Sequence, residues 1–324
     1  MTTSGRWHDL AERFCLGSLR GAPAYVARGS MGEIWRLETA GGCWAVKWQF
    51  PWAPADPRPP DVPVQLAAAQ AGIPLPLPVL TPDGAAVISA GGGHARVYRW
   101  AELSDPLVPP VGPPAAAEVG RLLGILHSLA IPAAEPEDPW YAEPPAAERW
   151  ASLTGRAAAA GTWWAPLLAA ASGLIGDLTA IAVPAGQPPL TCHRDFHPGN
   201  VLPDRSDGHL VVLDWENAGR LDPRRELGYA LFVWSCGAGR TDEAAANALL
   251  AGYTATAGRA VDLGAGLFAT AAAVHLNFLA AMAEQALDDP EHRSFAEEAI
   301  ASLLDADLAD LSRLAGTFGG KDTS

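Results

Sequence analysis

Residues 191–216 constrain this chain more than any other stretch, because they combine closely spaced acids with a hairpin pattern. Two short apolar segments, 201–202 and 210–213, are separated by the turn-forming residues 203–208. Apolar segments that flank a cluster of Pro, Asp, Ser and Gly are typical of a β-hairpin. The stretch therefore predicts two short paired strands with polar side chains before and after them.

The polar side chains at the mouth of this hairpin predict a magnesium site. In the simplest register Asn200 lies opposite Asp214, and directly opposed residues are about 5 Å apart. Mg²⁺ prefers oxygen ligands, often one or two carboxylates together with phosphate oxygens. Asp195 lies a few residues upstream, where it could act as a base, and His193 is expected to brace the loop by hydrogen bonds. Glu216 supplies a further acid just after the hairpin.

The N-terminal part predicts a three-stranded meander at residues 24–28, 33–38 and 43–48, joined by tight turns. Glycines at both ends of the first turn let the backbone approach a phosphate closely. The residues of this turn expected to contact nucleotide phosphates are Gly29, Ser30 and Gly32. A Gly-x-x-Gly hairpin taken alone is more often only a hairpin, so this prediction depends on what accompanies it.

Lys47 accompanies the glycine turn. Pairing of the second and third strands places it opposite Ile34, close to that turn. A strand lysine taken alone is commonly a surface residue, but Lys47 lies within an apolar string, and an unpaired buried charge is costly. Lys47 is therefore expected to have an acidic partner or a phosphate ligand.

The composition changes near residue 100, and this change predicts a boundary between two lobes. Two further strands are expected at 85–89 and 95–100, and a Pro-rich segment follows them. We expect a nucleotide-binding lobe at residues 1–100, a catalytic and substrate-binding lobe at 101–324, and a hinge at 98–105. Apolar residues at helical spacing predict helices around 7–14 and at 64–71, 115–129, 146–158, 164–181, 241–257, 263–287 and 291–314. The predicted fold class is α+β, with a small β-rich N-lobe and a larger, mostly helical C-lobe.

The net charge and the cysteine content limit the classes of binding partner and the location that we expect for this chain. The net charge of -14 disfavours binding to nucleic acid and to anionic membranes, and favours cationic small molecules. The four cysteines form no C-x-x-C pair, and the N-terminus lacks the apolar core of a secretory signal, so a cytoplasmic location is expected. The uncharged segment 263–282 is expected to be a buried core helix rather than a membrane span.

The order of these features suits phosphoryl transfer. That reaction requires held phosphates, a placed metal ion and an oriented hydroxyl group rather than covalent chemistry by the protein. The glycine turn and Lys47 come first, in the β-rich lobe, and the acids come later, in the helical lobe. A cleft between the lobes is expected to hold a nucleotide.

The sequence His193-Arg194-Asp195-x-x-x-x-Asn200 matches the catalytic-loop pattern of protein kinases. The fuller string, with His197-Pro198-Gly199 inside it and Asp214-x-Glu216 after it, resembles the aminoglycoside phosphotransferase family, which has a protein-kinase-like fold. By this resemblance Asp195 is the catalytic base, Asn200 and Asp214 bind Mg²⁺, and Lys47 contacts the phosphates of ATP. The hinge residues that the resemblance places against adenine are Tyr98 and Trp100.

The chain also departs from the patterns of its relatives. No activation segment and no Ala-Pro-Glu follow Asp214, as they would in a protein kinase. In the small-molecule branch an Asp follows the Asp-Pro pair and starts a helix, whereas this chain has Glu226 there. The acid that usually pairs with the nucleotide-binding lysine is expected on the helix before Gly72, where Asp61 or Gln65 stands.

The resemblance implies an ATP- and Mg²⁺-dependent transfer to a hydroxyl group of a small molecule. Acids on the C-terminal helices, together with the net charge, favour a cationic acceptor such as an amino sugar, an aminoglycoside or other antibiotic, or an amino alcohol. An antibiotic-resistance role and a metabolic role are both open. The alternatives are a catalytically silent nucleotide-binding scaffold and, less favoured, a protein kinase.

Overall fold

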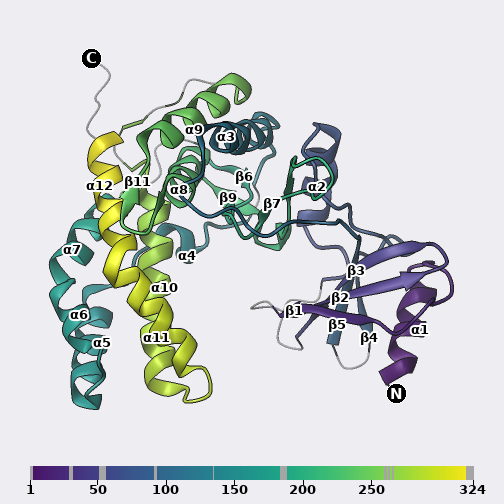
Figure 1. Ribbon diagram of the computed structural model, residues 1–324, viewed down its shortest axis with the longest axis horizontal. Helices are drawn as coiled ribbons and strands as arrows, with labels where there is room; N and C mark the ends of the chain where they lie inside the picture. The colour runs from purple at the N-terminus through teal and green to yellow at the C-terminus, as the bar shows by residue number, and fades with distance from the viewer. Residues whose placement is uncertain are drawn as a thin grey trace. The chain divides into compact units, whose positions relative to one another are not determined.

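The computed structural model describes residues 3–28, 32–50, 56–90, 93–133, 135–182, 188–258, 261, 263–264 and 266–318. The chain forms two units. The N-terminal unit consists of Met1–Asp105 and Leu202–Glu216, and the C-terminal unit consists of Pro106–Val201 and Asn217–Ser324. Figure 1 labels the helices and strands of both units.

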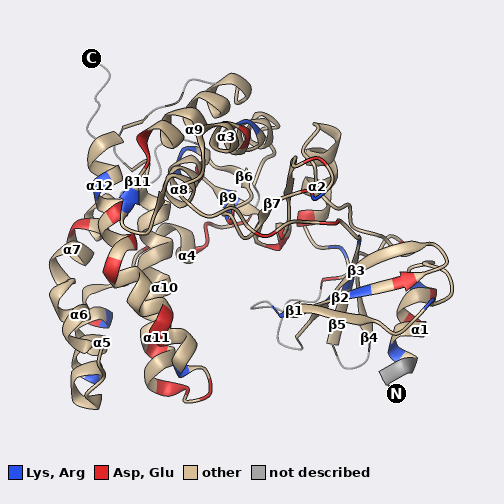
Figure 2. Cartoon of the chain, viewed as in Figure 1, with Lys and Arg blue, Asp and Glu red and all other residues tan. Residues whose placement is uncertain are grey.

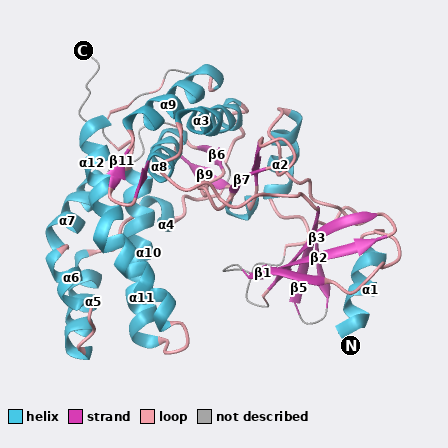
Figure 3. Cartoon of the chain, in the orientation of Figure 1, coloured by secondary structure: helices cyan, strands magenta, loops and turns pink. Residues whose placement is uncertain are grey.

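A five-stranded antiparallel sheet forms the centre of the N-terminal unit (Figure 3). Its strands, in the spatial order β1-β2-β3-β5-β4, are β1 (Ala24–Arg28), β2 (Gly32–Thr39), β3 (Gly42–Gln49), β5 (Gly93–Arg99) and β4 (Val87–Ala90). Helices α1 (Thr3–Arg13) and α2 (Asp61–Gln70) belong to the same unit. The predicted meander is confirmed, including the pairing of Ile34 with Lys47.

One face of this sheet packs into an apolar core with α1. The core includes Trp44, Val46 and Trp48 of β3, which alternate with less buried residues along the strand. Helix α1 contributes Trp7, Leu10 and Ala11, and Phe14 follows directly after the helix. Because successive side chains of a strand point to opposite faces, Lys47 lies on the face away from this core.

The predicted hairpin after the catalytic-loop motif is also present. Strands β7 (Val201–Pro203) and β8 (Leu210–Val212) pair, and the short helix η1 (Trp215–Asn217) follows. The N–H of Asp204 donates to the carbonyl oxygen of His209 across the turn, at 2.8 Å. The N–H of Ser104 donates to the carbonyl oxygen of Pro203, which attaches the segment before the unit boundary to this hairpin.

The C-terminal unit is mainly helical (Figure 3). Its helices are α3 (Pro113–Ser128), α4 (Pro139–Ala142), α5 (Ala147–Ala160), α6 (Ala165–Ala170), α7 (Ser172–Ile181), α8 (Pro223–Ser235), α9 (Glu243–Thr256), α10 (Ala269–Asp288), α11 (Arg293–Ser302), the π-helical segment η2 (Leu303–Asp307) and α12 (Leu308–Phe318). Its short strands are β6 (Leu190–Cys192), which pairs with β9 (Gly219–Leu221), and β10 (Cys236–Gly237), which pairs with β11 (Arg240–Thr241).

Helices α3 and α9 pack closely through glycines. A β-carbon on Gly120 would collide with the carbonyl of Leu249, and one on Gly252 would collide with the carbonyl of Ala117. The absence of side chains at these positions lets the two backbones approach each other. Helix α3 also carries His127, and α8 carries Glu226, so this packing helps to fix the interior on which the catalytic loop rests.

Three helix predictions were wrong in detail. The helix expected at 164–181 divides at Ala171, where weak helix formers, Ser172 and Gly173, follow. The helix expected at 291–314 is interrupted by η2. Helix α2 begins at Asp61, earlier than expected. Pro63 is tolerated in the first helical turn, because an N–H group at that position would have no partner within the helix.

A fourth prediction, the helix at 263–287, was wrong at its start, because helix α10 begins at Ala269. The helix lies largely in the core, as predicted, and Ala272, Leu276 and Leu279 are buried. None of the helices in the described part of the chain combines the length and the apolarity that a membrane crossing requires. The expected disordered tail at 319–324 lies outside the described residues.

Candidate active site

The loop between β6 and β7 carries the catalytic-loop motif. Strand β6 pairs with β9 in the register Thr191 opposite Arg220, so the loop leaves a fixed strand end. Arg194 lies in the left-handed region with φ 68°. A non-glycine residue there is strained by roughly 1 kcal/mol, so neighbouring contacts must hold it. The loop is therefore shaped by contacts with its surroundings rather than by local preference.

The carboxylate of Asp195 is held by three side chains of the C-terminal unit. The amide nitrogen of Asn200 donates to its Oδ2 at 2.9 Å, and that of Asn217 donates to the same oxygen at 3.2 Å. Nε2 of His197 lies 3.3 Å from the other oxygen, Oδ1. The N–H of Gly199 donates to Nδ1 of His197, which leaves Nε2 as the nitrogen that carries the proton. These donors fix the orientation of the carboxylate.

Two of these partners were missed from the sequence. Asn217 directly follows the last acid of the motif, and only its position next to Glu216 could have drawn attention to it. His197 was expected to form part of a tight turn. It does support that turn through Gly199, and it also contacts Asp195.

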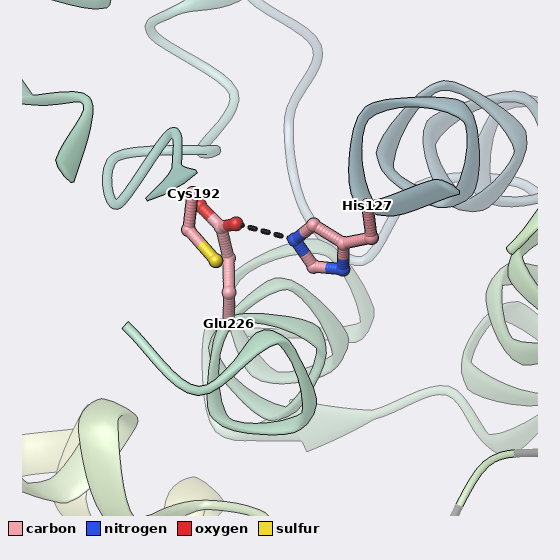
Figure 4. Close-up of side chains that lie close together, drawn as sticks. All are labelled: His127, Cys192 and Glu226. Atoms are coloured by element: carbon pink, nitrogen blue, oxygen red, sulfur yellow. Dashed lines mark hydrogen bonds and ion pairs between the residues drawn. The ribbon is translucent and has the colours of Figure 1, made fainter. Parts of the chain in front are cut away.

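Glu226 supports the catalytic loop by accepting hydrogen bonds from its backbone. It accepts the backbone N–H of His193 at 3.3 Å and that of Arg194, and it lies 2.7 Å from Nε2 of His127 (Figure 4). Nδ1 of His127 lies 2.8 Å from the hydroxyl of Tyr253. Burial disfavours the charged carboxylate, but the hydrogen bond and charge of His127 outweigh it, so the pKa of Glu226 is lowered. The strained backbone at Arg194 is thus held by a buried carboxylate.

His193 is itself fully buried, and its Nδ1 accepts the N–H of Asp195 at 3.3 Å. Its ring meets Phe196 edge-on, with centroids 5.6 Å apart. This geometry agrees with a bracing role. The prediction that His127 is a packed core histidine is confirmed, since His127 is 1% exposed.

His127, Cys192 and Glu226 also form a compact set of potential metal ligands (Figure 4). Two observations argue against a metal here. The imidazole and the carboxylate are already joined by a hydrogen bond. Burial raises the pKa of the Cys192 thiol well above its ordinary value, so the thiol stays protonated and a poor ligand. We interpret the cluster as a support for the catalytic loop.

The start of α8 resolves the question about helix capping. The side chain of Asp222 caps α8 by accepting the N–H of Arg224 at 2.9 Å. Glu226 lies one turn into the helix and is fully buried. The acid expected to start the helix is therefore not a cap, and its longer side chain reaches the catalytic loop instead.

In the N-terminal unit Lys47 contacts two carboxylates. Its Nζ lies 2.8 Å from Oδ1 of Asp214 and also contacts Oε2 of Glu216. Burial disfavours the charged ammonium, but the charges of Glu216 and Asp214 outweigh it and raise the pKa of Lys47. The expectation that Lys47 has a partner is therefore met, although neither Asp61 nor Gln65 provides it.

Asp61 pairs with Arg96 instead. Nη2 of Arg96 lies 2.7 Å from Oδ2 of Asp61, and Nη1 lies 2.9 Å from Oε1 of Glu216. Gln65 donates its amide N–H to Asp61 at 2.6 Å. The expected lysine partner on α2 was wrong because a second cation, Arg96, lies on the strand next to Lys47. Nothing in the local sequence pattern around Arg96 had indicated this role.

The remaining predicted nucleotide contacts have mixed outcomes. Gly29 and Ser30 lie outside the described residues. Gly32 begins β2, where a β-carbon would lie 2.9 Å from Cα of Gln49, so strand packing alone already requires a glycine. The hydroxyl of Tyr98 lies 3.5 Å from Glu216, within the charged cluster. The ring of Trp100 lies under the guanidinium of Arg36, at 5.1 Å.

The two predicted metal ligands belong to different units, so their pairing stays a prediction. The amide nitrogen of Asn200 donates to Asp195, so the side-chain oxygen of Asn200 is the atom that could bind a cation. Asp214 is partly exposed, at 38% of its side chain, and lies in the left-handed region with φ 55°. Both residues offer the oxygen donors that Mg²⁺ requires, so the chemistry of the donor set fits the ion.

Acidic residues lie on helices α10 and α11 of the C-terminal unit (Figure 2). Several of these acids, which were expected to attract a cationic acceptor, have partners within the same unit. Arg149 of α5 binds Glu284 of α10 through two nitrogens, each at 2.9 Å, and Arg156 lies 2.5 Å from Asp288. The indole N–H of Trp163 donates to Glu297 at 3.0 Å. These acids join neighbouring helices, which weakens the argument that they serve to bind a cation.

Solved structures share this fold at low sequence identity. A spectinomycin phosphotransferase, solved with ADP and spectinomycin, has a TM-score of 0.68 and 14% identity, and the match covers 94% of this chain and 98% of that one. An amicoumacin kinase, solved with AMP-PNP and Ca²⁺, has a TM-score of 0.63 and 14% identity over 96% and 97% of the two chains. A microcompartment-associated aminopropanol kinase has a TM-score of 0.62 and 14% identity over 97% and 98%. No curated protein sequence matches the chain.

The fold is therefore the protein-kinase-like α+β fold predicted from the sequence, and these neighbours are kinases of small molecules. Residues 26–264 match the phosphotransferase enzyme family, and this match covers more than half of the chain. The chain belongs to that family. It is a phosphotransferase, as the catalytic-loop motif had indicated.

Proposed function

We propose that the protein transfers the terminal phosphoryl group of ATP, with Mg²⁺, to a hydroxyl group of a small cationic molecule. The observation that carries this proposal is the carboxylate of Asp195, which Asn200, Asn217 and His197 hold in one orientation. A carboxylate fixed in this way can orient an attacking hydroxyl group and accept its proton, which is one of the tasks of the protein in phosphoryl transfer.

The N-terminal unit would bind the nucleotide. Lys47 would neutralise phosphate oxygens, and Asn200 and Asp214 would hold Mg²⁺, which supplies charge neutralisation of the phosphates when bound. The glycine turn at Gly29, Ser30 and Gly32 would cover the phosphates. The hinge residues proposed to contact adenine are Tyr98 and Trp100. Solved relatives of this fold contain ADP, AMP or AMP-PNP, which supports nucleotide binding.

The acceptor is proposed to be an amine that carries a hydroxyl group. The net charge of -14 supports a cationic molecule, because an acidic protein attracts cations and repels anions. The pairing of Glu284 with Arg149 removes one acid from this argument. Spectinomycin and aminopropanol, named for two structural neighbours, are both hydroxylated amines and make natural members of a test panel.

The test is ADP release in the presence of hydroxylated amines, with matched neutral alcohols as controls and mass spectrometry of the product. We expect one amine to gain a phosphate in a Mg²⁺-dependent reaction. The Asp195→Asn variant should fold normally and lose about 10³-fold in kcat, the scale of a general base.

The outcome decides between function classes. Nucleotide binding without transfer to any acceptor would favour a silent scaffold, and labelling of added protein substrates would favour a protein kinase. An Asp195→Asn variant with wild-type kcat would contradict the proposed role of Asp195. Faster turnover of the neutral alcohols than of the amines would contradict the cationic acceptor.

A further inference from the structure

Lys47 and Arg96 are directly opposed on neighbouring strands. The register of β3 and β5 pairs them, so both side chains lie on the same face of the sheet, away from the core that α1 covers. Like charges at directly opposed positions destabilise a sheet. Their proximity therefore requires an acid that both cations can share.

Glu216 is that acid. Its Oε2 contacts Nζ of Lys47, and its Oε1 lies 2.9 Å from Nη1 of Arg96. Arg96 is 2% exposed, so its guanidinium is almost entirely removed from water. Its other terminal nitrogen binds Asp61, in the first turn of α2. The contacts form a chain from Asp61 through Arg96 and Glu216 to Lys47, all within the N-terminal unit.

This series of contacts gives the acid on α2 a different partner from the expected one, Lys47. The acid on α2 contacts Arg96, and Arg96 in turn contacts the acid that holds Lys47. Because a guanidinium presents separate donors in a rigid fork, one Arg96 can bind Asp61 and Glu216 at the same time. Neutralisation of Glu216 by Arg96 leaves more of the charge of Lys47 available to a phosphate group.

We propose that Arg96 is a positioning residue for phosphoryl transfer, which holds Glu216 so that Lys47 can bind nucleotide phosphates. This inference rests on the proposed function. Without Arg96, Glu216 would have Lys47 as its main cationic partner, and phosphate would have to compete with a stronger ion pair. The position of α2 would also lose its connection to Lys47.

The first experiment compares Arg96→Met with the wild type. Methionine keeps an unbranched apolar stem and removes the charge. We expect KM for ATP to rise about tenfold, the scale of one hydrogen bond to a charged group, while KM for the acceptor changes less than about twofold. Arg96→Lys should recover part of the loss, because it restores the charge without the fork.

Two control variants separate positioning from folding. Arg58→Met removes an exposed arginine of the same unit, which donates to the carbonyl oxygen of Asp83 at 3.0 Å, and should leave both KM values unchanged. In the double variant Asp61→Asn/Arg96→Met, the acid left unpaired by the loss of Arg96 is neutralised. It should regain thermal stability relative to Arg96→Met while KM for ATP stays raised.

A double-mutant cycle with Lys47→Met tests whether Arg96 acts through Lys47. In that background Arg96→Met should have no further effect on KM for ATP. An equal effect in both backgrounds would overturn the inference, as would an equal rise of the two KM values in the single variant.

A readout independent of activity is available because the chain contains two lysines, Lys47 and Lys321. In protein labelled at lysine, the NMR signal of the Lys47 side chain should move in Arg96→Met at fixed pH without nucleotide, and it should stay in place in the control variant Arg58→Met. An unmoved Lys47 signal would overturn the inference. If the wild type transferred no phosphate, the proposed function would fail, and the Lys47 signal would still decide whether Arg96 positions it.

Discussion

Two glutamates, one in each unit, hold the residues proposed to carry the reaction, and they do so in different ways. Glu216 in the N-terminal unit contacts the side-chain cations of Lys47 and Arg96. Glu226 in the C-terminal unit contacts His127 and two backbone N–H groups. A side-chain cation can move from a carboxylate to a phosphate, whereas a backbone N–H group is held in place by the fold of its loop. Glu216 therefore belongs to an adjustable site, and Glu226 to a fixed support.

The pKa values agree with this difference. Burial raises the pKa of Glu216; Lys47 and Arg96 oppose the rise, while the nearby Asp214 carboxylate adds to it. The pKa of Glu226 is lowered in spite of its burial, because His127 and the N–H of Arg194 stabilise its charged form. The fixed support is thus the better-satisfied carboxylate of the two.

Replacement of each glutamate by glutamine should lower the free energy of unfolding by clearly different amounts. In Glu226→Gln one oxygen becomes an N–H₂ donor that faces other donors, so the free energy of unfolding should fall by about 3 kcal/mol. In Glu216→Gln each cation keeps another acid, Asp214 for Lys47 and Asp61 for Arg96. The loss there should be about 1 kcal/mol.

Chemical denaturation of both variants measures the difference, with the wild type as reference. The slope of unfolding free energy against denaturant should stay unchanged, which would show that both variants unfold from the same compact state. Equal losses in the two variants, or a larger loss in Glu216→Gln, would contradict the distinction between fixed and adjustable sites.

His275 is expected to make the stability of the C-terminal unit depend on pH. His275 packs edge-on against Phe232, with centroids 4.8 Å apart, and burial lowers its pKa to about 4. The folded protein therefore keeps His275 neutral in a range where the unfolded chain, with a pKa of about 6.5, takes up a proton. Stability should fall by up to about 3 kcal/mol as the pH falls from about 6.5 to 4.

The His275→Gln variant isolates this contribution, because glutamine does not titrate. Its unfolding free energy, measured from pH 8 to pH 4, should fall less steeply than that of the wild type between pH 6.5 and pH 4. Parallel curves for the two proteins would show that His275 is not held neutral in the folded state.

The sequence predicted what depends on neighbouring residues along the chain. The turn between β2 and β3 set the pairing of Lys47 with Ile34, and the spacing in the catalytic loop identified Asp195 and Asn200 together. The hairpin at β7 and β8 followed from its turn residues. These features rest on local turn chemistry and alternation, which a single sequence carries.

The contacts that were missed join residues on elements that are not consecutive in the sequence. Arg96 meets Lys47 only because β5 lies next to β3 in the sheet, ahead of β4. Glu226 was considered as a helix cap, whereas the packing of α8 turns it inward to His127. Asn217 gave no signal beyond its place after Glu216. Side chains that meet across non-consecutive elements leave no periodic trace in the sequence.

We propose that Lys47 holds the nucleotide and that Asp195 acts on the acceptor. The affinity for ADP with Mg²⁺, measured by calorimetry for Lys47→Met and Asp195→Asn side by side, tests this assignment most directly. We predict that Lys47→Met weakens binding about tenfold or more, as expected for the loss of a charged phosphate contact, while Asp195→Asn binds within about twofold of the wild type. Unchanged affinity in Lys47→Met, or a loss confined to Asp195→Asn, would contradict the claim.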